Sequence, residues 1–252
     1  MVKVYFMMSY AFFIVIVLWF YVEFGMDFEI GVVCFIYYSL KKLSIMKTKT
    51  LQWIVMGFFA FGFVGLAIPW SFPFFVVLTP LAIVAVLAML IVGHDGPMNW
   101  QFYASLGIVF ALSYVVELLK VNVFFPSSVY FYGDSLGPVL LEIPLLIGLA
   151  WVALIYICAA MAERLKTNVV VKVLVASGLM VLFDAALELV AHGLDLWYWI
   201  YGVSIWNYLM WFVVSVVMFT IMKLLDVSIK NRVATTMYVS MIVFLLGLSM
   251  VM

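Results

Sequence analysis

Charged residues are scarce in this chain of 252 residues: Asp, Glu, Lys and Arg make up 10% of it, against roughly 25% in an ordinary soluble domain. Hydrophobic residues account for 69%, and 12 basic and 12 acidic side chains cancel in charge. The chain therefore has neither the basic surface that binds nucleic acid nor an acidic tail. The composition is that of an integral protein of the cell membrane.

Cysteine is also rare, and its placement argues against redox and metal chemistry. The two cysteines, Cys34 and Cys158, lie in separate apolar segments and form no CxxC motif. No nucleotide-binding glycine motif and no convincing metal motif is present, so the sequence predicts no cofactor and no metal. On residue type alone, Asp184, Glu188, His192 and Asp195 are an alternative metal-ligand set.

Long apolar runs recur along the whole chain. A helix needs roughly 20 residues to cross about 30 Å of hydrocarbon. Runs of this kind predict an all-α, polytopic membrane bundle with nine spans at residues 4–22, 27–45, 51–69, 72–92, 100–120, 137–161, 169–192, 203–225 and 233–251. Charges at both ends of segment 27–45 make eight spans the alternative. We expect one transmembrane domain over residues 1–252, with Pro80 and Pro144 kinking their helices.

The basic residues indicate an orientation in the membrane. With a cytoplasmic N-terminus and nine spans, every Lys and Arg except Lys120 falls in an inner loop or flank, as the positive-inside rule requires. The C-terminus is then outside. Most acids, in contrast, fall in outer loops or in the outer halves of helices.

Apart from Asp27 and Glu29 at the start of segment 27–45, four acids lie within the predicted spans, where an ionisable group costs roughly 2.5–3.5 kcal/mol and normally faces the protein interior. Asp184 and Glu188 are four positions apart and share a helix face, with His192 one turn further. Asp184 would lie roughly 12 Å below the helix end, at 1.5 Å per residue. We expect Asp184, Glu188, Glu117 and Glu142 to point into one cavity in the outer half of the bundle.

Structural roles compete with functional ones at several of these positions. Glu117 and Lys120, spaced i,i+3, also fit an interfacial ion pair, and Glu142 fits an interfacial anchor. Asp134 in "YFYGDSLGP" fits a turn or a helix cap, and His192 fits a helix C-terminus. The aromatic stretch "WYWIYGVSIWNY" fits an interfacial belt as well as the wall of a pocket for a long apolar ligand.

Three stretches carry a resemblance to a known family: "SYVVELLKVNVFFPSSVYFYGDSLGPVLLEIPLLIGLAW", "FDAALELVAHGLDLWYW" and "YGVSIWNYLMW". They resemble the signature blocks of carotenoid biosynthesis membrane proteins, typified by bisanhydrobacterioruberin hydratase and carotenoid hydratases. The resemblance covers residues 113–211, and the first hundred residues match only as a hydrophobic profile. The matching positions are Glu117, Pro126, Tyr130, Tyr132, Leu136, Gly137, Pro138, Pro144, Trp151, Asp184, Glu188, Trp197, Trp199, Gly202, Val203, Asn207 and Trp211.

The chain departs from the family pattern at positions that bear on the substrate. Glu188 stands where the family has a second Asp, and Leu189 and Ser204 replace prolines. Met210 replaces a glycine. The substrate therefore stays open between a carotenoid with an acyclic end, a geranylgeranyl chain of an ether lipid and another polyprenyl lipid.

The resemblance implies a hydratase that adds water to a terminal isoprene double bond of such a lipid, without a cofactor. The reaction needs an acid to protonate the alkene to a tertiary cation and a base to guide water. Asp184 would be the acid, and Glu188 or Glu117 the base. Asn207 and Tyr132 would orient water or a carboxyl group. Substrate contacts would come from these two and from Tyr130, Asp134, Glu142, Trp151, His192, Trp197, Trp199 and Trp211.

Two other functions remain as alternatives. A proton-coupled carrier would use intramembrane acids as a relay, but it predicts broken helices and an internal repeat, which the sequence does not show. A membrane prenyltransferase would need paired Asp-rich motifs for magnesium and diphosphate, and only one D-x-x-x-E is present.

Overall fold

The computed structural model describes residues 47–122 and 129–252. The first two predicted spans, at residues 4–22 and 27–45, lie outside the described residues, as do Cys34 and Pro126. The helices that are described follow the predicted order closely.

Long apolar helices dominate this part of the chain. They are α3 (Thr48–Ala67), α6 (Trp100–Asn122), α7 (Leu145–Ala162), α8 (Val169–Glu188) and α9 (Ile205–Leu224). All five are long and apolar enough to cross a membrane, and the protein is an integral membrane protein. The apolar helix α10 (Ala234–Ser249) is shorter.

The predicted span 72–92 is divided into α4 (Phe72–Val77) and α5 (Thr79–Val92). Each has a proline in its first turn, Pro73 in α4 and Pro80 in α5. Proline suits this position because its fixed φ is helical and the first turn needs no N–H donor. Pro80 was expected to kink one helix, and the span is instead divided at Leu78, with Pro80 in the first turn of the second helix.

The predicted span 137–161 begins later than expected, because a short hairpin precedes α7. Strand β2 (Val139–Leu140) pairs with β3 (Ile143–Pro144), and Leu141 and Glu142 form the turn with φ of 49° and 69°. Pro144 directly precedes α7 and does not kink it. A proline disfavours helical backbone in the residue before it, here Ile143, so the helix begins after Pro144. Glu142 is exposed in the turn, so the prediction that it lies inside a span is wrong.

A second strand pair joins segments far apart in the sequence. Strand β1 (Tyr130–Tyr132) runs antiparallel to β4 (Trp197–Trp199), with Tyr130 opposite Trp199 and Tyr132 opposite Trp197. Alternate residues of a strand point to opposite faces. The central residues stack on one face, where the rings of Phe131 and Tyr198 are 5.2 Å apart. The two tyrosines and two tryptophans therefore share the other face.

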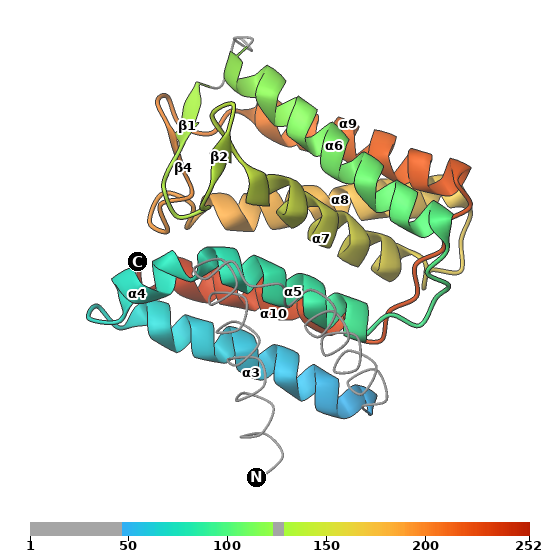
Figure 1. Cartoon of the computed structure of the whole chain (residues 1–252), viewed down its shortest axis with the longest axis horizontal. Coiled ribbons are helices and arrows are strands. Elements are labelled where there is room, and N and C mark those ends of the chain that lie inside the picture. Colours follow the sequence, from blue (N-terminus) through green and yellow to red (C-terminus); the bar gives the residue numbers. More distant parts are fainter. Residues whose placement is uncertain (1–46, 123–128) are drawn as a thin grey trace, which may run out of the picture. The chain divides into compact units, whose positions relative to one another are not determined.

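Helix α7 forms the centre of the packing. Its residues 151–158 are all buried, and it packs against α5, α6, α8 and α10. Helices α8 and α9 pack together along their lengths. Both strand pairs lie at one end of α6, α7, α8 and α9, where α6 and α8 end and α7 and α9 begin (Figure 1).

The loop after α5 and the loop before α10 are connected by hydrogen bonds at the helix ends opposite the strands. The ring of His94 (Nδ1) lies 2.6 Å from the hydroxyl of Tyr156, which also accepts a 2.9 Å hydrogen bond from Nδ2 of Asn231. Arg232 donates to the carbonyl of Val92 at 3.0 Å. These bonds fix the helix ends farthest from the strands.

Candidate active site

Three carboxyl groups gather in a pocket beside the strands. It is lined from α6, β1, α7, α8, β4 and α9. We call it the acid pocket, and its lining residues are Glu117, Lys120, Tyr130, Tyr132, Ile147, Asp184, Glu188, Trp197, Trp199, Asn207 and Trp211. Most of the residues singled out from the sequence thus meet in one place.

Asp184 is the most deeply buried of the three acids, with no exposed surface. Asn207, in the first turn of α9, donates from Nδ2 to Oδ2 of Asp184 at 2.9 Å. Neither Oδ1 of Asp184 nor Oδ1 of Asn207 has a hydrogen-bond partner among the described residues. A buried oxygen without a donor costs roughly 1–3 kcal/mol. These two atoms therefore favour a water molecule, or a proton on Asp184, in the space beside them.

Glu188 is the last residue of α8 and lies next to strand β4. Its Oε2 accepts hydrogen bonds from two indole N–H groups, Nε1 of Trp197 at 3.1 Å and Nε1 of Trp199 at 2.9 Å. The two tryptophans reach the same oxygen because they are two positions apart and share one face of the strand. Hydrogen bonds to an ionised acceptor are the stronger ones, so this arrangement suits a carboxylate.

Glu117, near the end of α6, has three donors. Its Oε2 accepts from the hydroxyls of Tyr130 and Tyr132, the latter at 2.9 Å, and lies 3.2 Å from Nζ of Lys120. Burial, and then the Glu117 carboxylate, raises the pKa of both phenols well above its ordinary value of 10.0. Both tyrosines thus remain donors at neutral pH. The i,i+3 ion pair is present, but it lies inside the acid pocket.

Aromatic rings form the inner wall of the acid pocket. Trp211 lines it, and Trp151 stacks on Trp211 with ring centroids 4.2 Å apart. Both tryptophans are buried. Their π faces can stabilise a cation, and such contacts gain strength when water is excluded.

Four candidates from the sequence are not among the residues that line the acid pocket, and one of them, Trp151, lies behind Trp211. Asp134 and Glu142 are exposed in turns, so the expectation that Glu142 shares the cavity is wrong. Its depth had been counted from a helix start that the β2–β3 hairpin displaces. His192 is exposed too, with its ring 4.8 Å from that of Tyr198. Asp195, three residues after His192, accepts a hydrogen bond from the hydroxyl of Tyr198 at 2.6 Å.

Two lining residues had not been proposed as site residues. Lys120 had been considered only as the surface partner of Glu117, yet it is 8% exposed and faces the acids. Its position one turn after Glu117 was the available signal. Ile147 lines the pocket from the first turn of α7, and an apolar residue in an apolar run carries no comparable signal.

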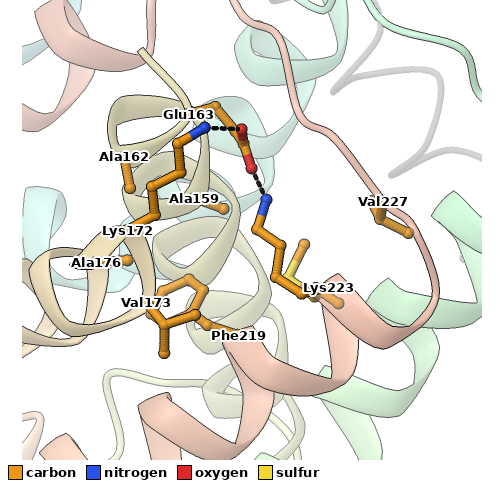
Figure 2. Close-up of a pocket in the computed structure, with 10 residues that line it drawn as sticks. Ala159, Ala162, Glu163, Lys172, Val173, Ala176, Phe219, Lys223 and Val227 are labelled. Carbon is orange, nitrogen blue, oxygen red and sulfur yellow. Dashed lines mark hydrogen bonds and ion pairs between the residues drawn. The ribbon is translucent and has the colours of Figure 1, made fainter. Parts of the chain in front are cut away.

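A second pocket lies at the other end of α7, α8 and α9 (Figure 2). Glu163 there bridges two lysines, with Oε2 3.0 Å from Nζ of Lys172 and Oε1 in contact with Lys223. The other residues that line this second pocket are apolar. Both oxygens of Glu163 already face ammonium groups. The three residues therefore link the end of α7, the start of α8 and the end of α9. Within the described ranges, no three His, Cys, Asp or Glu side chains are placed to hold a metal.

Fold and site together define an integral membrane protein with carboxyl groups gathered in an aromatic pocket at one end of its helices. Residues 72–252 match the family model described as carotenoid biosynthesis protein, and the chain belongs to this family. The match confirms the resemblance and extends it from residue 113 back to residue 72, where the sequence alone showed only an apolar profile. No curated protein and no solved structure matches the chain.

Proposed function

We propose that the protein is an enzyme of carotenoid biosynthesis that adds water to the terminal isoprene double bond of an acyclic carotenoid end. The observation that carries this proposal is the unequal bonding of two acids on one helix face. Oδ1 of Asp184 has no partner among the described residues, whereas Glu188 accepts two indole N–H bonds. One acid is suited to give a proton and the other to receive one.

The reaction follows from this division. Asp184 donates its proton from Oδ1 to the CH carbon of the double bond, whose π electrons form the new C–H bond and leave a tertiary cation. The rings of Trp211, Trp197 and Trp199 line the pocket and stabilise that cation. Water attacks the cationic carbon while Glu188 accepts its proton. The product is a tertiary alcohol, and transfer of the proton from Glu188 to Asp184 restores the starting state.

Glu117 serves a different purpose in this proposal. With Tyr130, Tyr132 and Lys120 around its carboxylate, it has no oxygen lone pair as free as those of Asp184. The sequence left the base open between Glu188 and Glu117, and the hydrogen bonds favour Glu188. Asn207 orients the Asp184 carboxyl group through its 2.9 Å bond and offers Oδ1 to the attacking water.

The basic residues indicate on which side of the membrane the acid pocket lies. The basic residues of the second pocket and of the loops next to α10 lie at the helix ends opposite the strands. Cytoplasmic loops are enriched in Lys and Arg. We therefore place the acid pocket in the outer half of the membrane, with the C-terminus outside, where a long isoprenoid chain can enter from the bilayer.

Expression in a host that makes acyclic carotenoids tests the proposed function. Mass spectrometry of the extracted pigments should show a gain of one water per modified end with the wild-type protein and none with Asp184→Asn. Detergent-purified protein should convert the same carotenoid without a proton gradient. Proton-driven uptake of a solute into vesicles, together with no hydrated product, would instead support a carrier.

A further inference from the structure

Lys120 occupies an unusual place for a lysine in a membrane helix. It is 8% exposed, and its ammonium group lies 3.2 Å from Oε2 of Glu117 and 4.8 Å from the ring centroid of Tyr130. A buried ammonium group is costly unless a carboxylate pairs with it. Lys120 is the one cationic side chain among the described residues that line the acid pocket.

The charges in the acid pocket are unbalanced. It holds three carboxyl groups and one ammonium group, and the ammonium group is paired with Glu117. Asp184 and Glu188 lie one turn apart with no cation of their own in the described lining. Two carboxylates that share a poorly solvated site cannot both ionise readily, so such a pair retains one proton.

We propose that Lys120 is a positioning residue that sets the charge of the acid pocket: its ammonium group offsets the charge of Glu117, so that Asp184 and Glu188 share a single exchangeable proton. The role in hydration rests on the proposed function, whereas the proton count rests on the geometry alone. Without the ammonium group, the described lining of the acid pocket would hold three carboxyl groups and no cation.

The groups that face Lys120 determine how its loss would appear. Glu117 faces it from α6, Tyr130 and Tyr132 from β1, and Asp184 and Glu188 from α8. The described lining from α7 and α9 contributes Ile147, Asn207 and Trp211, which do not titrate. Tyr208, also on α9, interacts electrostatically with Asp184 and Glu188. Because the phenols of Tyr130 and Tyr132 remain neutral at ordinary pH, the charge that faces Lys120 comes from carboxyl groups.

The test compares Lys120→Met, Lys120→Arg and the double variant Glu117→Gln/Lys120→Met in detergent-purified protein. Lys166→Met is a matched control, because Lys166 is exposed and outside the acid pocket. The first measurement is the infrared band of protonated carboxyl groups as pH is raised, which requires no activity. The second is the pH profile of hydration.

Removing a positive charge makes nearby carboxyl groups hold their protons to higher pH. In Lys120→Met the infrared titration and both limbs of the rate profile should therefore move up by about one pH unit or more. Lys120→Arg and Lys166→Met should titrate as the wild type does. The double variant should return toward the wild type, because it removes one negative and one positive charge together.

The results that would contradict the proposal are equally specific. A Lys120→Met protein that titrates as the wild type does would remove Lys120 from the role assigned here. If Lys120→Met does not fold, the double variant decides: a shifted titration in it overturns the proposal. If the infrared shifts occur but no isoprenoid is hydrated even by the wild type, the proposed function fails while the shared proton stands.

Discussion

Asn207 distinguishes the two oxygens of Asp184: its amide donates to Oδ2 at 2.9 Å and leaves Oδ1 without a partner among the described residues. The relationship depends on the packing of α8 against α9, because each helix supplies one of the two side chains. A donor on Oδ2 leaves Oδ1 as the oxygen that can carry a transferable proton. The acid proposed from sequence thus acquires a definite reacting atom.

Replacement of Asp184 by asparagine should abolish hydration while the protein stays folded. The amide keeps the size of the side chain but cannot donate a carboxyl proton, and general acid–base catalysis contributes about 10²–10⁴-fold. The rate per mole of protein should fall at least that far. Asp226→Asn is the control, because Asp226 is exposed and φ there is 54°, which asparagine tolerates. A near wild-type rate in Asp184→Asn would mean that another acid supplies the proton.

Glu188→Gln should also reduce hydration strongly, because glutamine cannot accept the proton of water. The informative variant is the double, Asp184→Asn/Glu188→Gln. If the two acids act in one proton cycle, the double variant should be little slower than the slower single variant, since catalytic residues that act as a unit are non-additive. Single-turnover rates on protein of matched membrane level measure this. Multiplicative losses would show that the two acids act independently.

The two indole donors allow a finer test of the base. Trp197→Phe and Trp199→Phe each keep an aromatic ring but remove one of the N–H bonds to Oε2 of Glu188. A hydrogen bond to a charged group is worth about 1.5–3 kcal/mol, which corresponds to a loss of roughly tenfold or more in rate. Trp206→Phe is the matched control, because Trp206 is 61% exposed. Equal rates in all three variants would argue that the indoles only fill space.

The sequence predicted the helices and the gathering of Glu117, Asp184 and Glu188 because both signals are local. Apolar length identifies a span, and four-residue spacing places Asp184 and Glu188 on one face of α8. Strands β1 and β4 were missed because each has only three residues and pairs with residues 65 to 69 positions away. The alternation in "YFY" and "WYW" was a signal for them, but a pattern that short does not distinguish a strand from an interfacial belt.

Glu142 and Lys120 show why the depth of a charged residue is hard to predict. Glu142 was placed by counting from a span boundary, and the β2–β3 hairpin moved that boundary to Leu145. For Lys120, the i,i+3 spacing from Glu117 left an interfacial ion pair as one of two interpretations. Lys120 is buried because β1 pairs with β4 beside the end of α6, and no local pattern encodes such long-range pairing.

Acid should destabilise the folded protein through His94. Burial lowers the pKa of His94 below its ordinary value of 6.5, so the fold favours the neutral ring. The unfolded chain binds the proton more readily, and stability is therefore complete above about pH 6.5 and falls as pH drops through the folded-state pKa. The unfolding temperature in detergent, measured from about pH 8 to pH 5, should show this loss. It should be smaller in His94→Phe, and an equal loss would assign the acid effect elsewhere.

Gly133 should be essential to the acid pocket although it is not one of its lining residues. A Cβ atom there would lie 2.2 Å from Oδ1 and 2.3 Å from the backbone oxygen of Asp195, closer than any side chain allows. Asp195 must then move, together with the loop that leads into β4. Because Trp197 and Trp199 lie in β4, they would be displaced as well. Gly133→Ala should therefore lower both the unfolding temperature and the hydration rate. Gly107→Ala is the control, because a Cβ atom meets nothing within 4 Å there and alanine favours a helix by roughly 1 kcal/mol. If Gly133→Ala retains both properties, the loop has room that this geometry denies, and the close fit between Gly133 and Asp195 does not hold the indoles in place.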